Sequence, residues 1–77
     1  MPRYLFTVQN SKPDPDTTEI DLADLEAARA MAMAEAGEML RDHRDSAWPT
    51  SDWWVHVTDE QGTTVCRITV SGEAEGP

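Results

Sequence analysis

The side chains that could do chemistry in this chain are two histidines, one cysteine and fifteen carboxylates. Zinc sites draw on Cys and His in closely spaced pairs, such as Cys-x-x-Cys or His-x-x-x-His. His43, His56 and Cys66 form no such pair. On the strand pattern described below, His56 and Cys66 also face opposite sides of a sheet. We therefore expect no metal centre and no other cofactor.

A second candidate site is the segment Asp14-Pro-Asp16, which opens like a calcium-binding loop of the Asp-x-Asp type. Such a loop needs glycine at its sixth position and glutamate at its twelfth. These positions hold Glu19 and Leu25. We interpret residues 14–18 as a solvated acidic loop.

The sequence also gives little indication of a catalytic nucleophile. Asp42, His43 and Ser46 are close in sequence, but no glycine-rich elbow accompanies them. Cys66 alternates with apolar residues and is expected to be a small buried side chain rather than a nucleophile. The four glycines are scattered, so they form no phosphate-binding loop. We expect a protein that is not an enzyme.

The charge balance restricts the partners. Six basic and fifteen acidic residues give a net charge of -9 at pH 7. Nucleic acids and anionic lipids are bound by clustered Lys and Arg, so neither is an expected partner. No apolar run approaches the roughly 18 residues of a membrane-spanning helix. A single cysteine allows no intrachain disulfide, and the N-terminus has no signal-peptide pattern, which favours a cytoplasmic location.

Hydrophobic periodicity predicts one small domain over residues 1–70, followed by a disordered acidic tail at residues 71–77. Strands are expected at residues 3–9 and 18–22, where apolar residues alternate. The period then changes to that of a helix, which begins after the N-cap residue Asp24 and ends near His43 or Arg44. The apolar stripe of this helix comprises Leu25, Ala28, Ala32, Ala36, Met39 and Leu40.

Residues 53–58 and 63–70 form the clearest hairpin. A three-residue connection would pair Val57 with Val65, whereas a four-residue connection pairs Val55 with Cys66. We favour the second because it gathers the apolar side chains of both strands on one face. These side chains are Trp53, Val55, Val57, Cys66, Ile68 and Val70.

These elements predict an α+β fold of order β-β-α-β-β. A right-handed crossover gives a four-stranded antiparallel sheet of order 2-1-3-4, with one helix packed on one face. The other face then exposes apolar residues, which is typical of a contact surface. With a tryptophan from the preceding loop, the candidate interaction surface is Leu5, Trp48, Trp54 and Val65. Arg29, at the edge of the helix stripe, is a candidate anchor: its guanidinium is either buried or extends into water while its stem packs on the sheet.

Three segments carry a resemblance to a known family: Met1-Pro-Arg-Tyr-Leu-Phe6, Asp24-Leu-Glu-Ala-Ala-Arg-Ala30 and Val55-His-Val-Thr-Asp-Glu-Gln-Gly62. In this order and spacing they resemble short uncharacterised bacterial proteins, common in alphaproteobacteria, that begin Met-Pro-Arg-Tyr-Phe-Phe. That family is a domain of unknown function. The resemblance implies a bacterial cytoplasmic protein and assigns no activity.

Three functional hypotheses follow, of which an enzyme with an unrecognised site is the least favoured. The first is a small non-catalytic protein-association module, a homodimer that pairs through the uncovered sheet face or a sheet edge. The alternative is an acidic inhibitor or antitoxin-like protein that caps a basic partner, because a net charge of -9 would steer it toward a cationic surface.

Overall fold

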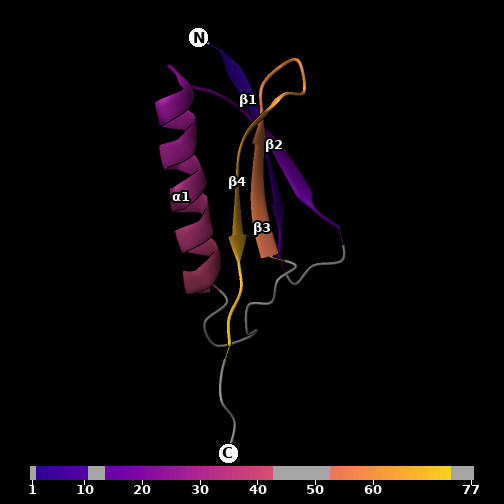
Figure 1. Cartoon of the computed structure of the whole chain (residues 1–77), viewed down its shortest axis with the longest axis vertical. Coiled ribbons are helices and arrows are strands. Elements are labelled where there is room, and N and C mark those ends of the chain that lie inside the picture. Colours follow the sequence, from indigo (N-terminus) through magenta and orange to yellow (C-terminus); the bar gives the residue numbers. More distant parts are fainter. Residues whose placement is uncertain (1, 11–13, 43–52, 74–77) are drawn as a thin grey trace, which may run out of the picture.

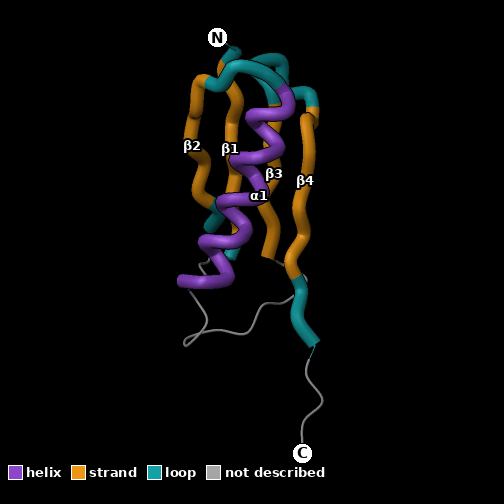
Figure 2. Tube along the Cα trace, turned by 90° about the vertical axis from the view of Figure 1, so that its left-hand side faces the viewer, coloured by secondary structure: helices purple, strands orange, loops and turns teal. Residues whose placement is uncertain are grey.

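The computed structural model describes residues 2–10, 14–42 and 53–73. They form strands β1 (Arg3–Gln9) and β2 (Asp16–Asp21), helix α1 (Leu25–Asp42), and strands β3 (Trp53–Thr58) and β4 (Thr64–Val70). All strand pairs are antiparallel, in the order β2-β1-β3-β4. Helix α1 lies along one face of this sheet (Figures 1 and 2). The predicted element order and sheet topology are therefore confirmed.

Helix α1 begins where the sequence predicts. The backbone N–H of Ala27 donates to Asp24 Oδ1 at 2.8 Å, so Asp24 caps the first turn. The buried side of α1 consists of Ala28, Ala32, Ala36 and Met39. Two leucines predicted for this stripe are instead largely exposed, Leu25 at 48% and Leu40 at 43%. Leu40 lies on the flank of the stripe, and Leu25 is the first residue of the helix and borders a surface hollow.

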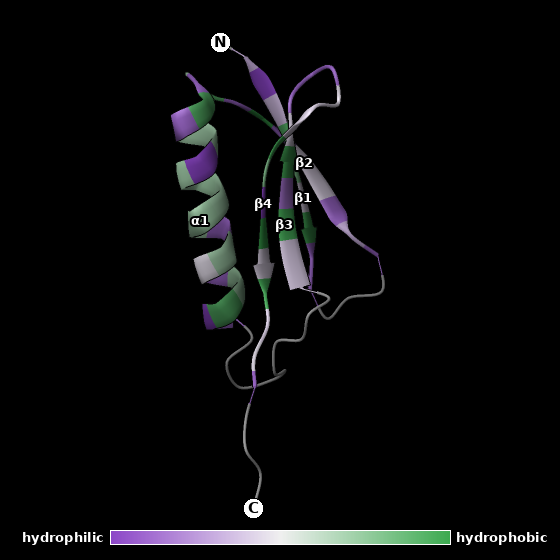
Figure 3. Ribbon diagram, viewed as in Figure 1, coloured by the Kyte–Doolittle hydropathy of each residue, from purple (hydrophilic) through white to green (hydrophobic). Residues whose placement is uncertain are grey.

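The core lies between α1 and the two central strands. Its large side chains are Tyr4 and Phe6 of β1 and Trp53, Val55 and Val57 of β3, all buried. Along β3, buried and half-buried residues alternate strictly, and in Figure 3 hydrophobic and hydrophilic bands alternate along the strand after its uniformly pale first part. The edge strands contribute the partly buried side chains of Ile20, Cys66, Ile68 and Val70, and Leu22, directly after β2, also packs against the core.

Strand β2 begins earlier than predicted. Val8 pairs with Asp16, so the ladder with β1 includes residues that we interpreted as loop. The hydroxyl oxygens of Thr7 and Thr17 share a hydrogen bond of 3.1 Å across this pair. The apolar alternation of β2 starts only at Ile20, which explains why the earlier residues gave no strand signal.

The β3–β4 hairpin corrects the predicted pairing. Val55 pairs with Ile68 and Val57 with Cys66, whereas Thr58 pairs with Thr64. Val65 is therefore an extra residue on β4, a β-bulge. The predicted partners were wrong by two residues, but an even shift leaves every side chain of the apolar set on its predicted face.

The turn itself explains the shift. The N–H of Gly62 donates to the carbonyl of Asp59 at 3.1 Å, and the N–H of Asp59 donates to the carbonyl of Thr63 at 3.0 Å. The connection is thus three residues long, with Gly62 at a φ of 84°. A left-handed residue at this place favours glycine. The carboxylate of Asp59 also accepts from the N–H groups of Gln61 and Thr63, both at 2.9 Å.

Candidate functional site

The face of the sheet opposite α1 carries an ordered group of aromatic and polar side chains. The guanidinium carbon of Arg67 lies 5.1 Å from the centre of the Trp54 ring. The rings of Trp54 and His56 meet edge to face, with centroids 6.3 Å apart and planes at 75°. His56 Nε2 and Thr64 Oγ1 share a hydrogen bond of 3.0 Å. We call these four residues the Trp54 cluster.

Strand pairing and the bulge place the Trp54 cluster. His56 pairs with Arg67 across β3 and β4, and Trp54 lies two residues from His56 on the same face. Without the bulge, Val65 would stand opposite Thr58 and face away from α1. The bulge puts Thr64 in that position, within reach of His56.

The predicted apolar patch is therefore not formed. Val65 packs against the core rather than facing away from α1. Leu5 does lie on the uncovered face, but it pairs with Thr58, whereas Trp54 pairs with Gln9. Between Leu5 and Trp54 lies the polar pair of Thr7 and His56. Trp48 lies outside the described residues, as do His43 and Ser46.

Arg29 does not act as a buried anchor. Its side chain is exposed, and no charged side chain is buried in the described part of the chain. It lies close enough to Cys66 for its charge to act on the thiol. This agrees with an arginine whose charge stays in water beside the sheet.

Cys66 is half-buried on the face of β4 that packs against the core. Burial raises the pKa of the Cys66 thiol, and the charge of Arg29 opposes this increase. The thiolate is the reactive form. We expect native Cys66 to react slowly with a disulfide reagent at neutral pH and promptly in denaturant, and Arg29→Gln to slow the native reaction further.

Stability should depend on the same thiol. Burial makes the pKa of the Cys66 thiol higher in the folded state than in the unfolded state. The thiol therefore adds to the free energy of unfolding at neutral pH, and this contribution is lost as the pH rises through the alkaline range in which the thiol ionises. Cys66→Ala should flatten this alkaline decline. In the experiment with the disulfide reagent, complete labelling of Cys66 in the native protein within minutes would contradict its placement against the core.

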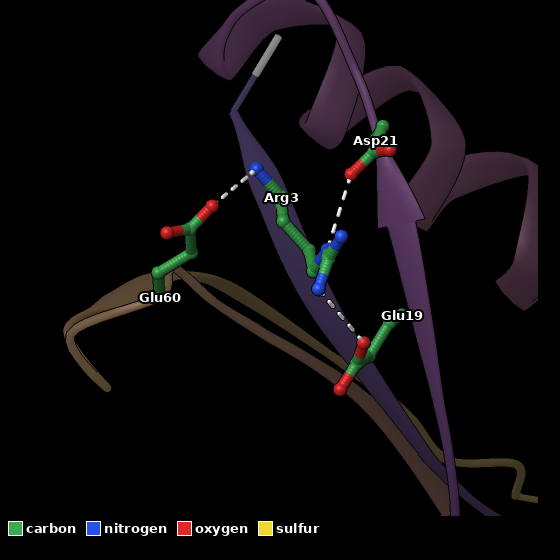
Figure 4. A network of polar contacts seen from close by, with 4 residues as sticks. All are labelled: Arg3, Glu19, Asp21 and Glu60. Carbon is green, nitrogen blue, oxygen red and sulfur yellow. Dashed lines mark hydrogen bonds and ion pairs between the residues drawn. The ribbon is translucent and has the colours of Figure 1, made fainter.

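A second group of side chains ties together the end of the molecule where β1 begins. The backbone N–H of Arg3 donates to Glu60 Oε1 at 3.1 Å. Its Nε donates to Asp21 Oδ1 at 3.3 Å, and its Nη1 to Glu19 Oε2 at 3.4 Å (Figure 4). The hydrogen bond and charge of Asp21 raise the pKa of Arg3, with a further contribution from Glu19. This network was not predicted, because its only signal in the sequence is the alternation of Glu19 and Asp21 along β2.

Beside Arg3 lies a surface hollow of about 390 Å³. Its lining comprises Pro2, Arg3, Tyr4, Leu25, Asp59, Glu60 and Gln61. Both carboxylates of this lining accept backbone N–H groups, Asp59 within the turn and Glu60 from Arg3. Asp59 therefore fixes the hairpin turn, and Glu60 holds this turn against β1, so both carboxylates have structural roles.

Within residues 2–10, 14–42 and 53–73, no group of three or more His, Cys, Asp or Glu side chains is arranged to hold a metal ion. In the same residues, no helix has both the length and the apolar character to cross a bilayer.

Comparison with known proteins identifies a family. A family model described as Domain of unknown function (DUF6894) matches residues 3–71, which is most of the chain. No curated protein and no solved structure matches the sequence.

Proposed function

As a member of the family Domain of unknown function (DUF6894), this chain inherits no assigned activity, and we propose that it is a small non-catalytic module that associates with a second copy of itself. The surface we assign to this contact is the sheet face opposite α1. The single cysteine allows no intrachain disulfide, which supports a cytoplasmic location for the protein.

The observation that carries the proposal is the Trp54 cluster. Trp54 is held by Arg67, which lies over its ring, and by an edge-to-face contact with His56, although no helix of the described residues covers this face. Tryptophan and arginine are enriched among the residues that dominate binding energy. A side chain already fixed in place loses little conformational entropy on association.

Charge supports a second copy as the partner. The charged residues of the described strands that point away from α1 are Arg3, Arg67, Glu19 and Asp21, so this face is formally neutral. The net charge of -9 therefore arises elsewhere. A contact through this face keeps the acidic surfaces of two copies apart.

The test is the mass of the protein in solution, measured by light scattering from micromolar to millimolar concentration. We expect a monomer–dimer equilibrium that tightens as salt is added. Salt shortens the screening length to about 10 Å at 0.1 M and so reduces the repulsion between two chains of charge -9. A monomer at every concentration and salt level would contradict self-association. The acidic inhibitor would then be the better hypothesis, and capture of a basic partner that weakens with salt would be its test.

A further inference from the structure

The charges on the uncovered face select one geometry for the dimer. Taking the proposed self-association as its basis, we propose that the two-fold axis runs parallel to the strands. Strand β4 of each copy then lies over β2 of the other. Arg67 of one chain faces Glu19 of the partner subunit, and the same contact recurs on the other side of the axis.

The uncovered face has an acidic edge and a basic edge. Strands β2 and β4 are the two outer strands of the sheet (Figure 2). At the β2 edge, Arg3 contacts both Glu19 and Asp21, so two carboxylates share one guanidinium and one negative charge remains. At the β4 edge, Arg67 lies against Trp54. Both ion pairs found among the described residues belong to Arg3, so the charge of Arg67 is not matched by a carboxylate there.

Two sheets that pack face to face keep their strands within about 30° of each other. A two-fold axis between them then runs either across the strands or along them. An axis across the strands stacks β2 on β2 and β4 on β4, which sets like charges against each other. An axis along the strands stacks β2 on β4, which sets Arg67 against the acidic edge. Opposite charges across an interface favour its register, and like charges oppose it.

The register of the sheet fixes the heights of the charged groups along the strands. Thr17, Thr7, His56 and Arg67 form one row across the four strands. An axis parallel to the strands keeps each row level with the same row of the partner. Arg67 therefore meets the row of Thr17. Glu19 is two residues farther along β2, on the side away from Trp54 and offset by about 6.6 Å along the strand. The long side chain of Arg67 can span this offset when it turns from the Trp54 ring toward Glu19.

Charge exchange tests this geometry. We expect Arg67→Glu alone to weaken the dimer about tenfold, because both symmetric contacts become repulsive. We expect Glu19→Lys alone to weaken it by a similar factor. The double variant Arg67→Glu/Glu19→Lys should regain most of the lost affinity, because both contacts are attractive again and only the contact of Arg67 with Trp54 stays absent. An equimolar mixture of the two single variants should form a heterodimer that is tighter than the homodimer of either variant.

These variants distinguish the effect of the Arg67–Glu19 contact from the effect of net charge on dimerisation. The double variant keeps the net charge of -9. Glu19→Lys makes the chain less acidic, so general repulsion predicts a tighter dimer where the contact predicts a weaker one. Glu19 is chosen over Asp21 because the Arg3–Asp21 ion pair is then left in place. Recovery in the double variant excludes misfolding as the cause of weakening in the single variants.

The outcomes are distinguishable. A monomeric parent protein would contradict the proposed function itself. If the parent protein is a dimer and neither single variant changes its dimerisation constant, the proposed function stands and this geometry is wrong. The axis across the strands would then be the better description, since it places Arg67 against its own copy.

Discussion

Replacing Trp53 with alanine is expected to lower the free energy of unfolding by about 3–5 kcal/mol. The Trp53 side chain is only 3% exposed and belongs to the core cluster that includes Tyr4, Phe6 and Val55. Truncation removes its buried area and leaves a cavity that the neighbouring strands cannot fill. A loss of this size is a large share of the stability of so short a chain, because such a chain buries only about 60% of its unfolded surface.

The next residue provides a matched control. Trp54 is the same residue type on the same strand, but it points to the opposite face and is half-buried. Trp54→Ala removes a contact with Arg67 that is worth about 0.5–1 kcal/mol at an exposed site, so its cost should be far smaller. Urea unfolding followed by far-UV circular dichroism measures both without relying on tryptophan fluorescence. If Trp54→Ala lowers the free energy of unfolding more than Trp53→Ala, our assignment of the two faces of β3 is wrong. Trp48→Ala should also cost less than Trp53→Ala.

The order of elements and the faces of the strands were predictable because both depend on short repeats. Alternation along β3 assigns Trp53, Val55 and Val57 to the core regardless of which strand lies beside them. The helix start was equally local, since Asp24 caps the turn that immediately follows it. The sheet order followed from the handedness of one crossover.

The pairing of β3 with β4 was not predicted because a bulge leaves no trace in hydropathy. The turn did contain a signal: Asp59 and Gly62 fit a type I turn followed by a left-handed residue, which is typical of three-residue connections. Given that turn, only an extra residue could restore the apolar face. Val65 was that residue, and its assignment to the uncovered face failed for this reason.

The face of the sheet that carries the candidate surface was predictable, but the residues that surround Trp54 on it were not. Trp54 and Leu5 lie on the uncovered face, yet their separation depends on the register between β1 and β3. That register joins residues about fifty positions apart and has no local signal. The contacts of Trp54 with Arg67 and His56 depend on the same long-range pairing. The surface is therefore a tryptophan set among polar groups rather than an apolar patch.

Trp54→Ser is expected to weaken the dimer at least about 30-fold, the equivalent of about 2 kcal/mol for a dominant interface residue. The substitution removes the largest side chain of the uncovered face and leaves Arg67 without the ring on which it rests. Folding should survive, because Trp54 lies outside the core cluster. Sedimentation equilibrium at several concentrations measures the effect, and the urea midpoint of the same sample confirms that the variant is folded.

Met33→Ser is the control for loss of an exposed apolar side chain. Met33 is 70% exposed on α1, the layer on the other side of the sheet. If association uses the uncovered face, Met33→Ser leaves the dimerisation constant unchanged while Trp54→Ser weakens it. The reverse result would move the contact to the outer surface of the helix. A dimer that tolerates both substitutions would direct the search to the edge of β4, where the backbone groups of an outer strand can pair with a second copy.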